Sequence, residues 1–292
     1  MDRAKLLPYA AGALAVLLWG ATPAATAVVA RAVPSGLVGV ARLLASAVVL
    51  APLMLALRPK LPADKGGWAA LLISASVGFA GSFACQGLGI ARTSTSHAAL
   101  VLTLAPVLTA LAQCVLSRQW PRPLWWAGSA IAVAGVAVLI LGRGIAKGGT
   151  EPTLLGDAIV FVSTVTVSIG YVAGARLSAR IGLFGATAWS ILLGALIILP
   201  AAPVLARALP AMTVAGASSL AFLAVGCTLV GYAAWFWALE RGGVARIALL
   251  QFAQPIVSVV IAAAFFAEAV STTVLLALAL ILGGVYLCRL GR

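Results

Sequence analysis

Charged residues are scarce in this chain, and acidic residues are the scarcest of all. Only 9% of the 292 residues are charged, and only six are Asp or Glu. A soluble domain carries about 25% charged residues, so this composition excludes an ordinary water-soluble protein. Hydrophobic residues make up 63% of the chain. A surface this apolar cannot face water, and the sequence therefore predicts a protein whose solvent is lipid.

Residues that build chemical centres are also few. The chain has one histidine, His97, and no Asp or Glu near the middle of a predicted membrane span. Its four cysteines lie in apolar runs without a Cys-x-x-Cys pair, as is typical of small buried residues. A Gly-x-Ser-x-Gly motif is absent as well. These absences argue against an enzyme, and we expect no catalytic residue, no metal and no cofactor.

Apolar sequence of membrane-spanning length is abundant. A run of about 20 residues crosses a hydrocarbon core of about 30 Å as a helix. Irregular backbone facing lipid would leave its N–H and C=O groups unpaired, so the spans should be helical. The sequence predicts an all-α membrane protein with ten transmembrane helices, at about 8–30, 35–57, 67–90, 95–116, 124–141, 155–177, 183–205, 212–239, 246–267 and 272–288.

The basic residues predict how these spans are oriented. The side that receives both termini and every second loop holds 13 of the 19 Lys and Arg residues. The other side holds five, and Arg42 lies within a span. Lys and Arg accumulate on the cytoplasmic side of membrane proteins, so both termini are expected in the cytoplasm. Because these residues are spread over short loops and form no patch, we expect no nucleic-acid partner.

The two halves of the chain repeat each other. When Pro106 is laid on Pro255, an offset of 149 residues, Ala99-Leu100 falls on Ala248-Leu249. Halves with an odd number of spans insert in opposite senses, and such inverted repeats commonly enclose a solute site at the membrane midplane. The sequence therefore predicts two inverted five-helix repeats around a central cavity. The repeats are expected to cover residues 1–145 and 146–292 of a single membrane domain.

Polar and aromatic residues follow one face of several spans. In lipid such side chains should face the bundle interior or a wet cavity. Ser and Thr can instead bond to their own helix, and aromatic residues at this spacing can simply pack. Spans five and ten carry few polar residues and are expected to be peripheral. The predicted substrate-binding residues are Trp19, Thr22, Phe79, Phe83, Gln86, Thr103, Ser168, Tyr171, Tyr232, Trp235, Gln251 and Gln254.

A few residues suggest gating or hinge roles. Arg42 could snorkel outward or pair with Asp157 at the outer end of span six, as a structural or gating ion pair. His97 begins span four and could be an interfacial residue or a substrate ligand. Pro106 and Pro255 each deprive a helix carbonyl of its donor, which predicts either a simple kink or a hinge.

Several short motifs carry a family resemblance. They are Trp19-Gly20, Pro34, Arg42, the run Ala98–Pro106, its echo Ile247–Pro255, Glu268 and Gly283-Gly284. With these the whole chain resembles the EamA branch of the drug/metabolite transporter superfamily, which includes aromatic amino acid exporters. The resemblance implies ten helices around a central cavity, with both termini in the cytoplasm. The first half departs from the pattern, since Gln119 stands where the second half has Glu268.

Composition, polar stripes and resemblance together predict a secondary transporter. We expect it to export small metabolites, chiefly amino acids with aromatic ones among the candidates, by alternating access and facilitated diffusion. The alternatives are a broader exporter of drugs or organic solutes and a non-transporting membrane scaffold. The expected partners are a small-molecule substrate and the lipid bilayer. The expected location is the bacterial inner membrane, as a monomer or weak homo-oligomer.

Overall fold

The computed structural model describes residues 3–118, 120–141, 151–208, 212–242 and 247–291, and within these it consists of helices joined by short loops. An α-helix satisfies its own backbone hydrogen bonds in lipid, which explains why each long apolar run becomes helical. The elements are α1 (Arg3–Gly20), α2 (Thr22–Val29), α3 (Ser35–Leu57), α4 (Lys65–Ile73), η1 (Ser74–Gly81), α5 (Ser82–Ile90), α6 (Thr95–Leu102), α7 (Ala105–Ser117), α8 (Pro123–Leu141), α9 (Leu154–Ile181), α10 (Leu183–Ile198), η2 (Leu199–Ala201), α11 (Ala202–Ala208), α12 (Val214–Ala221), η4 (Phe222–Val230), α13 (Gly231–Gly242), η5 (Ala248–Ala253), α15 (Gln254–Phe266) and α16 (Thr272–Leu290).

Seven helical segments of the described chain are long and apolar enough to cross a membrane. Three shorter apolar helices, Pro123–Val138, Gln254–Phe266 and Thr272–Cys288, fall at the positions of predicted spans five, nine and ten. The predicted all-α membrane fold is confirmed. The order of the segments along the chain also follows the order of the predicted spans.

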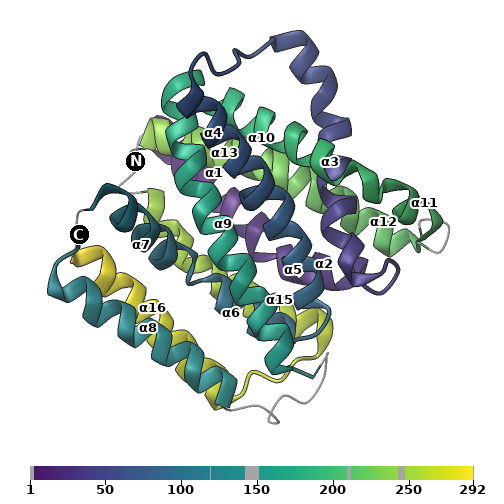
Figure 1. Cartoon of the computed structure of the whole chain (residues 1–292). Coiled ribbons are helices and arrows are strands. Elements are labelled where there is room, and N and C mark those ends of the chain that lie inside the picture. The colour runs from purple at the N-terminus through teal and green to yellow at the C-terminus, as the bar shows by residue number, and fades with distance from the viewer. Residues whose placement is uncertain (1–2, 119, 142–150, 209–211, 243–246, 292) are drawn as a thin grey trace.

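Both ends of the chain lie on the same side of the bundle (Figure 1). We call this the terminal side, and the opposite end of the bundle the far side. Helix α9 begins on the far side and ends on the terminal side, where α10 begins. Helix α6 begins on the far side, next to the loop that joins α15 to α16. These positions determine which residues meet at each end of the bundle.

The internal repeat is visible in the local backbone. The third segment contains the π-helical stretch η1, and its counterpart in the second half contains the π-helical stretch η4. The residue that caps the end of α7, Arg118, has φ of 55°, and the residue that caps the end of α15, Ala267, has φ of 51°. These two left-handed caps are 149 residues apart, which is the offset that aligns Pro106 with Pro255. The boundary predicted at residues 145 and 146 lies outside the described residues.

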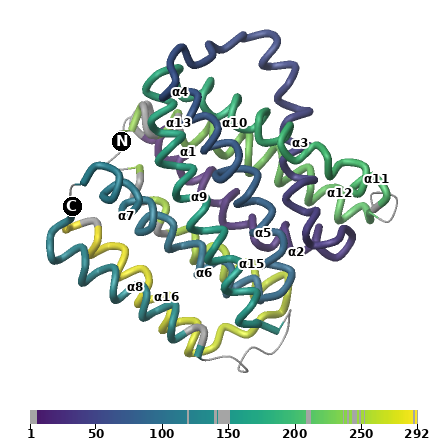
Figure 2. Tube along the Cα trace, viewed as in Figure 1, coloured from purple at the N-terminus to yellow at the C-terminus, as the bar shows by residue number. Residues whose placement is uncertain are grey.

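Helices α8 and α16 pack against each other along their whole lengths and form the flank of the bundle (Figures 1 and 2). Small residues permit this close approach, as is common between membrane helices. A methyl group added at Gly128 would lie 2.5 Å from the carbonyl oxygen of Gly284. The two predicted spans with few polar residues are therefore the peripheral ones, as expected.

Helix α9 packs against six other elements of the bundle. It contacts α4, η1, α5, α6, α7 and α10, which together come from both halves of the chain. It approaches η1 closely, where Gly170 of α9 meets Gly78 backbone to backbone. A methyl group added at Gly78 would lie 2.6 Å from the α-carbon of Gly170. Only a residue without a side chain fits at either position.

This contact generates a prediction on stability. Gly170→Ala should destabilise the fold by about 1–3 kcal/mol, because its new methyl group collides with the backbone of η1. Gly283→Ala is the matched control, since nothing lies within 4 Å of its added methyl group. Alanine otherwise favours a helix, so the control should melt at or above the wild-type temperature. Thermal unfolding of the purified protein in detergent measures both, and a Gly170→Ala protein as stable as the control would contradict the packing.

Candidate functional site

A cavity of about 650 Å³ lies between helices of the two repeats. Eleven of the twelve residues that the sequence assigned to substrate binding line this cavity. Spans two and seven also contribute, through Arg42, Ala186 and Thr187. Thr109 also lines the cavity, and its hydroxyl is buried with no hydrogen-bond partner within the described residues. The eleven residues that meet there are Trp19, Thr22, Phe79, Phe83, Gln86, Thr103, Tyr171, Tyr232, Trp235, Gln251 and Gln254.

Ser168 is the exception, and its assignment to the cavity is wrong. Ser168 is buried, and its hydroxyl donates to the carbonyl oxygen of Thr164 at 2.7 Å. The carbonyl oxygen of Ala105 lies 3.2 Å from the same hydroxyl. The bond to Thr164 is the local bond to the helix backbone that serine commonly makes. The face of α9 that borders the cavity carries Gly170 and Tyr171 instead.

Five aromatic side chains form a continuous wall of the cavity. Trp19 contacts Tyr232 and Trp235, with ring centroids 5.2 and 5.5 Å apart. Phe79 contacts Phe83 at 5.7 Å and Tyr232 at 6.4 Å. The tilted and edge-on arrangements are those that aromatic pairs prefer. The wall joins the two repeats, because Phe79 and Phe83 belong to the first half and Tyr232 and Trp235 to the second.

Arg42 is the positively charged residue in the described lining of the cavity, and it is only 6% exposed. Its Nε donates to the hydroxyl of Thr228, and its Nη1 donates to the Oε1 of Gln86, both at 3.2 Å. The guanidinium also lies 4.1 Å from the centre of the Phe83 ring. The structure contradicts the predicted pair of Arg42 with Asp157. Arg42 turns inward to the cavity because neutral partners there can accept its N–H groups.

Two backbone features hold Arg42 in this position. Gly39 brings α3 against the backbone of Phe83, which lets the guanidinium lie over that ring. The π-helical stretch η4 orients Thr228, whose hydroxyl donates to the carbonyl of Leu223, five residues earlier, at 2.8 Å. Short π-helical stretches often occur at functional sites. No sequence motif marks these backbone features, so sequence analysis did not pair Arg42 with Thr228, Gln86 and Phe83.

The far side of the bundle is closed by two buried carboxylates. Asp157 accepts a hydrogen bond from the Thr93 hydroxyl at 2.5 Å, and its other oxygen lies 3.2 Å from Nδ1 of His97. Both His97 and Asp157 are buried, and neither lines the cavity. The structure therefore brings His97 to Asp157 at the start of α9 and not to the cavity.

Glu268 makes a second contact of the same kind. Its carboxylate accepts from the backbone N–H of Thr95 at 2.8 Å, and from the N–H and hydroxyl of Ser96 at 3.0 and 2.6 Å. A carboxylate is favoured at a helix N-terminus, where N–H groups lack partners within the helix. We call Thr93–His97, Asp157 and Glu268 the far-side latch. In it, both carboxylates come from the second half of the chain and hold the start of α6 in the first half.

The cavity extends from the middle of the bundle toward the terminal side. Ser178 near the end of α9 and Leu183 at the start of α10 line it. Trp235 and Gln251, on the terminal-side parts of their segments, also line it. The described lining residues thus reach one end of the bundle, whereas the latch closes the other.

The two prolines predicted as hinges stand at breaks between helical pieces. Pro106 lies in the first turn of α7, after a tight turn in which Thr103 and Leu104 bond to residues three positions earlier. Pro255 lies in the first turn of α15, after the 3₁₀ piece η5. Both prolines border the cavity. The structure shows interrupted helices at both positions, and a hinge motion remains a prediction.

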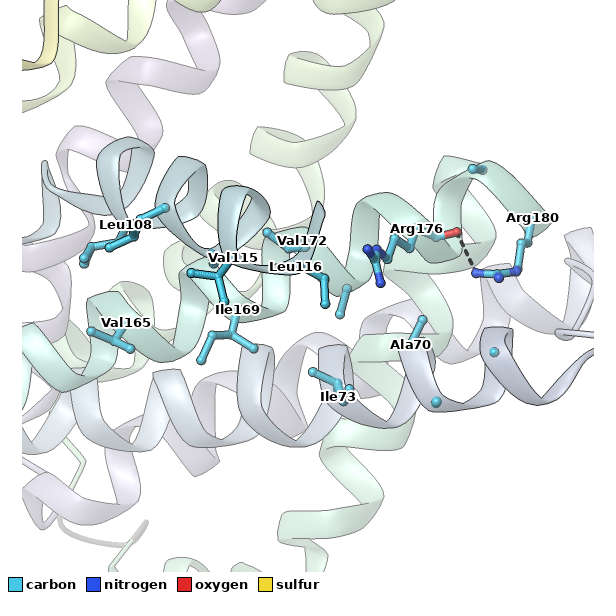
Figure 3. A pocket seen from close by; sticks show the side chains of 16 residues that line it. Ala70, Ile73, Leu108, Val115, Leu116, Val165, Ile169, Val172, Arg176 and Arg180 are labelled. Carbon is cyan, nitrogen blue, oxygen red and sulfur yellow. Dashed lines mark hydrogen bonds between the residues drawn. The ribbon is translucent and has the colours of Figure 1, made fainter. Parts of the chain in front are cut away.

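A larger hollow of about 980 Å³ lies between α4, α7 and α9 (Figure 3). Its walls are apolar side chains such as Leu108, Val115 and Ile169. Arg176 and Arg180 stand at one end, where Nη1 of Arg180 donates to the carbonyl of Arg176 at 3.4 Å. This hollow offers a polar solute no partner along its apolar length, so it is the poorer candidate for a solute site.

Known proteins share this sequence pattern. Residues 6–141 and 154–290 each match the EamA-like transporter family. The uncharacterized transporter YdeK of Bacillus subtilis is 30% identical over 187 residues, which are 63% of this chain and 62% of that protein. A probable terminal-alkyne amino-acid exporter of Streptantibioticus cattleyicolor is 26% identical over 70% of this chain and 68% of its own length.

Two further matches extend along the whole chain. The uncharacterized inner membrane transporter YedA of Escherichia coli K12 is 23% identical over 99% of this chain and 92% of its own length. A crystal structure with 23% identity superposes with a TM-score of 0.63, covering 97% of this chain and 96% of that one, and shows the same fold. With both halves matched, the chain belongs to the EamA-like transporter family.

Proposed function

We propose that this protein is a secondary transporter that exports small organic solutes by alternating access, with amino acids as its principal substrates. The observation that carries the proposal is one cavity, built by helices of both repeats and closed at one end by the far-side latch. Its volume of about 650 Å³ falls within the range typical of small-molecule sites. A scaffold protein would need no such polar and aromatic lining.

Alternating access requires the closed end to open. In the outward-open state the contacts of Asp157 and Glu268 with Thr93–His97 break, and the cavity closes on the terminal side. Breaking the latch exposes two carboxylates and several N–H groups to water, which compensates for the lost bonds. The equilibrium between the two states can therefore lie near balance, as a carrier needs.

The preference for amino acids has two supports. The relative from Streptantibioticus is named as a probable amino-acid exporter. The cavity combines an aromatic wall with the amide groups of Gln86, Gln251 and Gln254, which suits a solute with an apolar body and a polar end. A broader range of organic solutes would use the same wall. Counterflow of a panel of radiolabelled amino acids and uncharged organic solutes in proteoliposomes decides between the two.

Side-chain truncation tests the cavity. Gln251→Ala should reduce counterflow about three- to tenfold, because it removes an amide that lines the site while leaving the fold intact. Ser129→Ala is the control, since Ser129 on the peripheral helix α8 contacts Cys288 and does not line the cavity. Both variants should be produced in similar amounts. Equal loss of transport in the two would contradict the assignment.

The orientation can be tested in cells. We propose that the protein lies in the bacterial inner membrane with its terminal side in the cytoplasm, because that side carries most of the Lys and Arg residues. Alkaline phosphatase, which is active only in the periplasm, should therefore be inactive when fused after Arg292. The same enzyme inserted after Leu141, where α8 ends on the far side, should be active. An active fusion after Arg292 would contradict this orientation.

The energetics of transport give a further prediction. No Asp, Glu or His lines the cavity among the described residues, so protonation of the site cannot be linked directly to solute binding. Flux into proteoliposomes should follow the solute gradient and change little when a pH gradient is imposed. Uphill accumulation that depends on the pH gradient and disappears in Asp157→Asn would show instead that the far-side latch couples protons to transport.

A further inference from the structure

The described lining of the cavity carries a positive charge, which belongs to Arg42. Its guanidinium lines the cavity, and the described lining includes no Asp or Glu. The partners of Arg42 are the hydroxyl of Thr228, the amide oxygen of Gln86 and the ring of Phe83, all of which are neutral. The cavity thus holds a buried positive charge without a protein counter-ion among the described residues.

We infer that Arg42 binds the carboxylate of the solute, and that the cavity selects organic monocarboxylates whether or not they carry an amino group. This inference rests on the proposed transport function and names its substrate class. A buried charge is costly unless it is paired, so a solute carboxylate gains more from this site than a neutral or cationic group does. The charge on the protein thereby decides the sign of the charge on the solute.

The geometry leaves donors for such a ligand. A guanidinium has five N–H donors. Within the described chain, Arg42 uses one at Nε and one at Nη1, and both hydrogen atoms of Nη2 bond to no described side chain or carbonyl. A carboxylate accepts two parallel hydrogen bonds from such a fork. The apolar body of the solute would then lie along the aromatic wall that begins at Phe83.

The described lining offers no equivalent group for an ammonium. The cavity offers it only amide oxygens, hydroxyl groups and ring faces, none of which carries a full negative charge. A cation stacked on an aromatic ring gains only a weak attraction, and that attraction competes with repulsion from Arg42. The carboxylate should therefore be required for binding and the amino group should not.

Four related probes separate these contributions. L-Phenylalanine, 3-phenylpropionate, phenylalanine amide and phenethylamine share one ring and differ in their charged groups. Binding to the purified protein is measured by quenching of tryptophan fluorescence, since Trp19 and Trp235 line the cavity. The two carboxylates should bind at least about 30-fold more tightly than the amide and the amine, because those leave Arg42 unpaired. Equal binding of all four, tighter binding of the amine, or binding of none overturns the inference.

Variants show whether Arg42 itself makes the selection. Arg42→Gln should abolish the preference for phenylalanine over its amide, whereas Arg42→Lys keeps the charge and should retain a weaker preference. If Arg42 only held Gln86 in place, Gln86→Met would remove the preference as well. We expect Gln86→Met to retain it, because the positive charge remains. An acid-to-amide ratio that Arg42→Gln leaves unchanged overturns the inference.

Transport is measured separately from binding. Counterflow of all four probes is compared in proteoliposomes that contain the wild-type protein. Selective binding of carboxylates without any flux would contradict the transport function and leave the ligand assignment standing. Flux of the amide and the amine that equals that of the acids would contradict the ligand assignment and leave the transport function standing.

Discussion

Polar groups of this chain that lie within the bilayer have to find their hydrogen-bond partners inside the protein, because lipid offers none. The helices satisfy most of the backbone, and the remaining polar groups decide how the helices pack. Where the helical pattern is irregular, a side chain from another segment completes it. The indole N–H of Trp19 donates to the carbonyl of Cys227 in η4 at 2.9 Å, and the hydroxyl of Ser258 donates to the carbonyl of Gly20 at 2.6 Å.

The same constraint separates the molecule into regions with different roles. Helices α8 and α16 have almost nothing polar to satisfy, so they pack through small residues and remain at the flank. The far-side latch concentrates buried carboxylates where N–H and hydroxyl groups at the start of α6 can pair with them. The central cavity is lined by polar groups that these contacts do not use, among them Arg42 and the glutamines.

Most of the residues that sequence patterns assigned to substrate binding line the cavity, and Ser168 does not. The stripe of Trp19 and Thr22 meets the cavity, because both residues lie on one face of one segment. In α9 the same reasoning chose Ser168, one of two serines near the middle of the helix. The other, Ser163, lines the cavity, whereas Ser168 bonds to its own helix backbone. A helix rotates by 100° per residue, so a small error in phase moves a side chain from a cavity to a backbone bond.

The sequence by itself determined that this is a helical membrane protein with two related halves, and which segments carry polar faces. Composition, span length and the 149-residue offset are properties of the chain alone, and they do not depend on which helices meet. Only the tertiary structure decided the partners: Asp157 with His97 and Thr93, Arg42 with Gln86 and Thr228. Each of these pairs joins segments at least 44 residues apart, and only the packing of the helices brings such segments together.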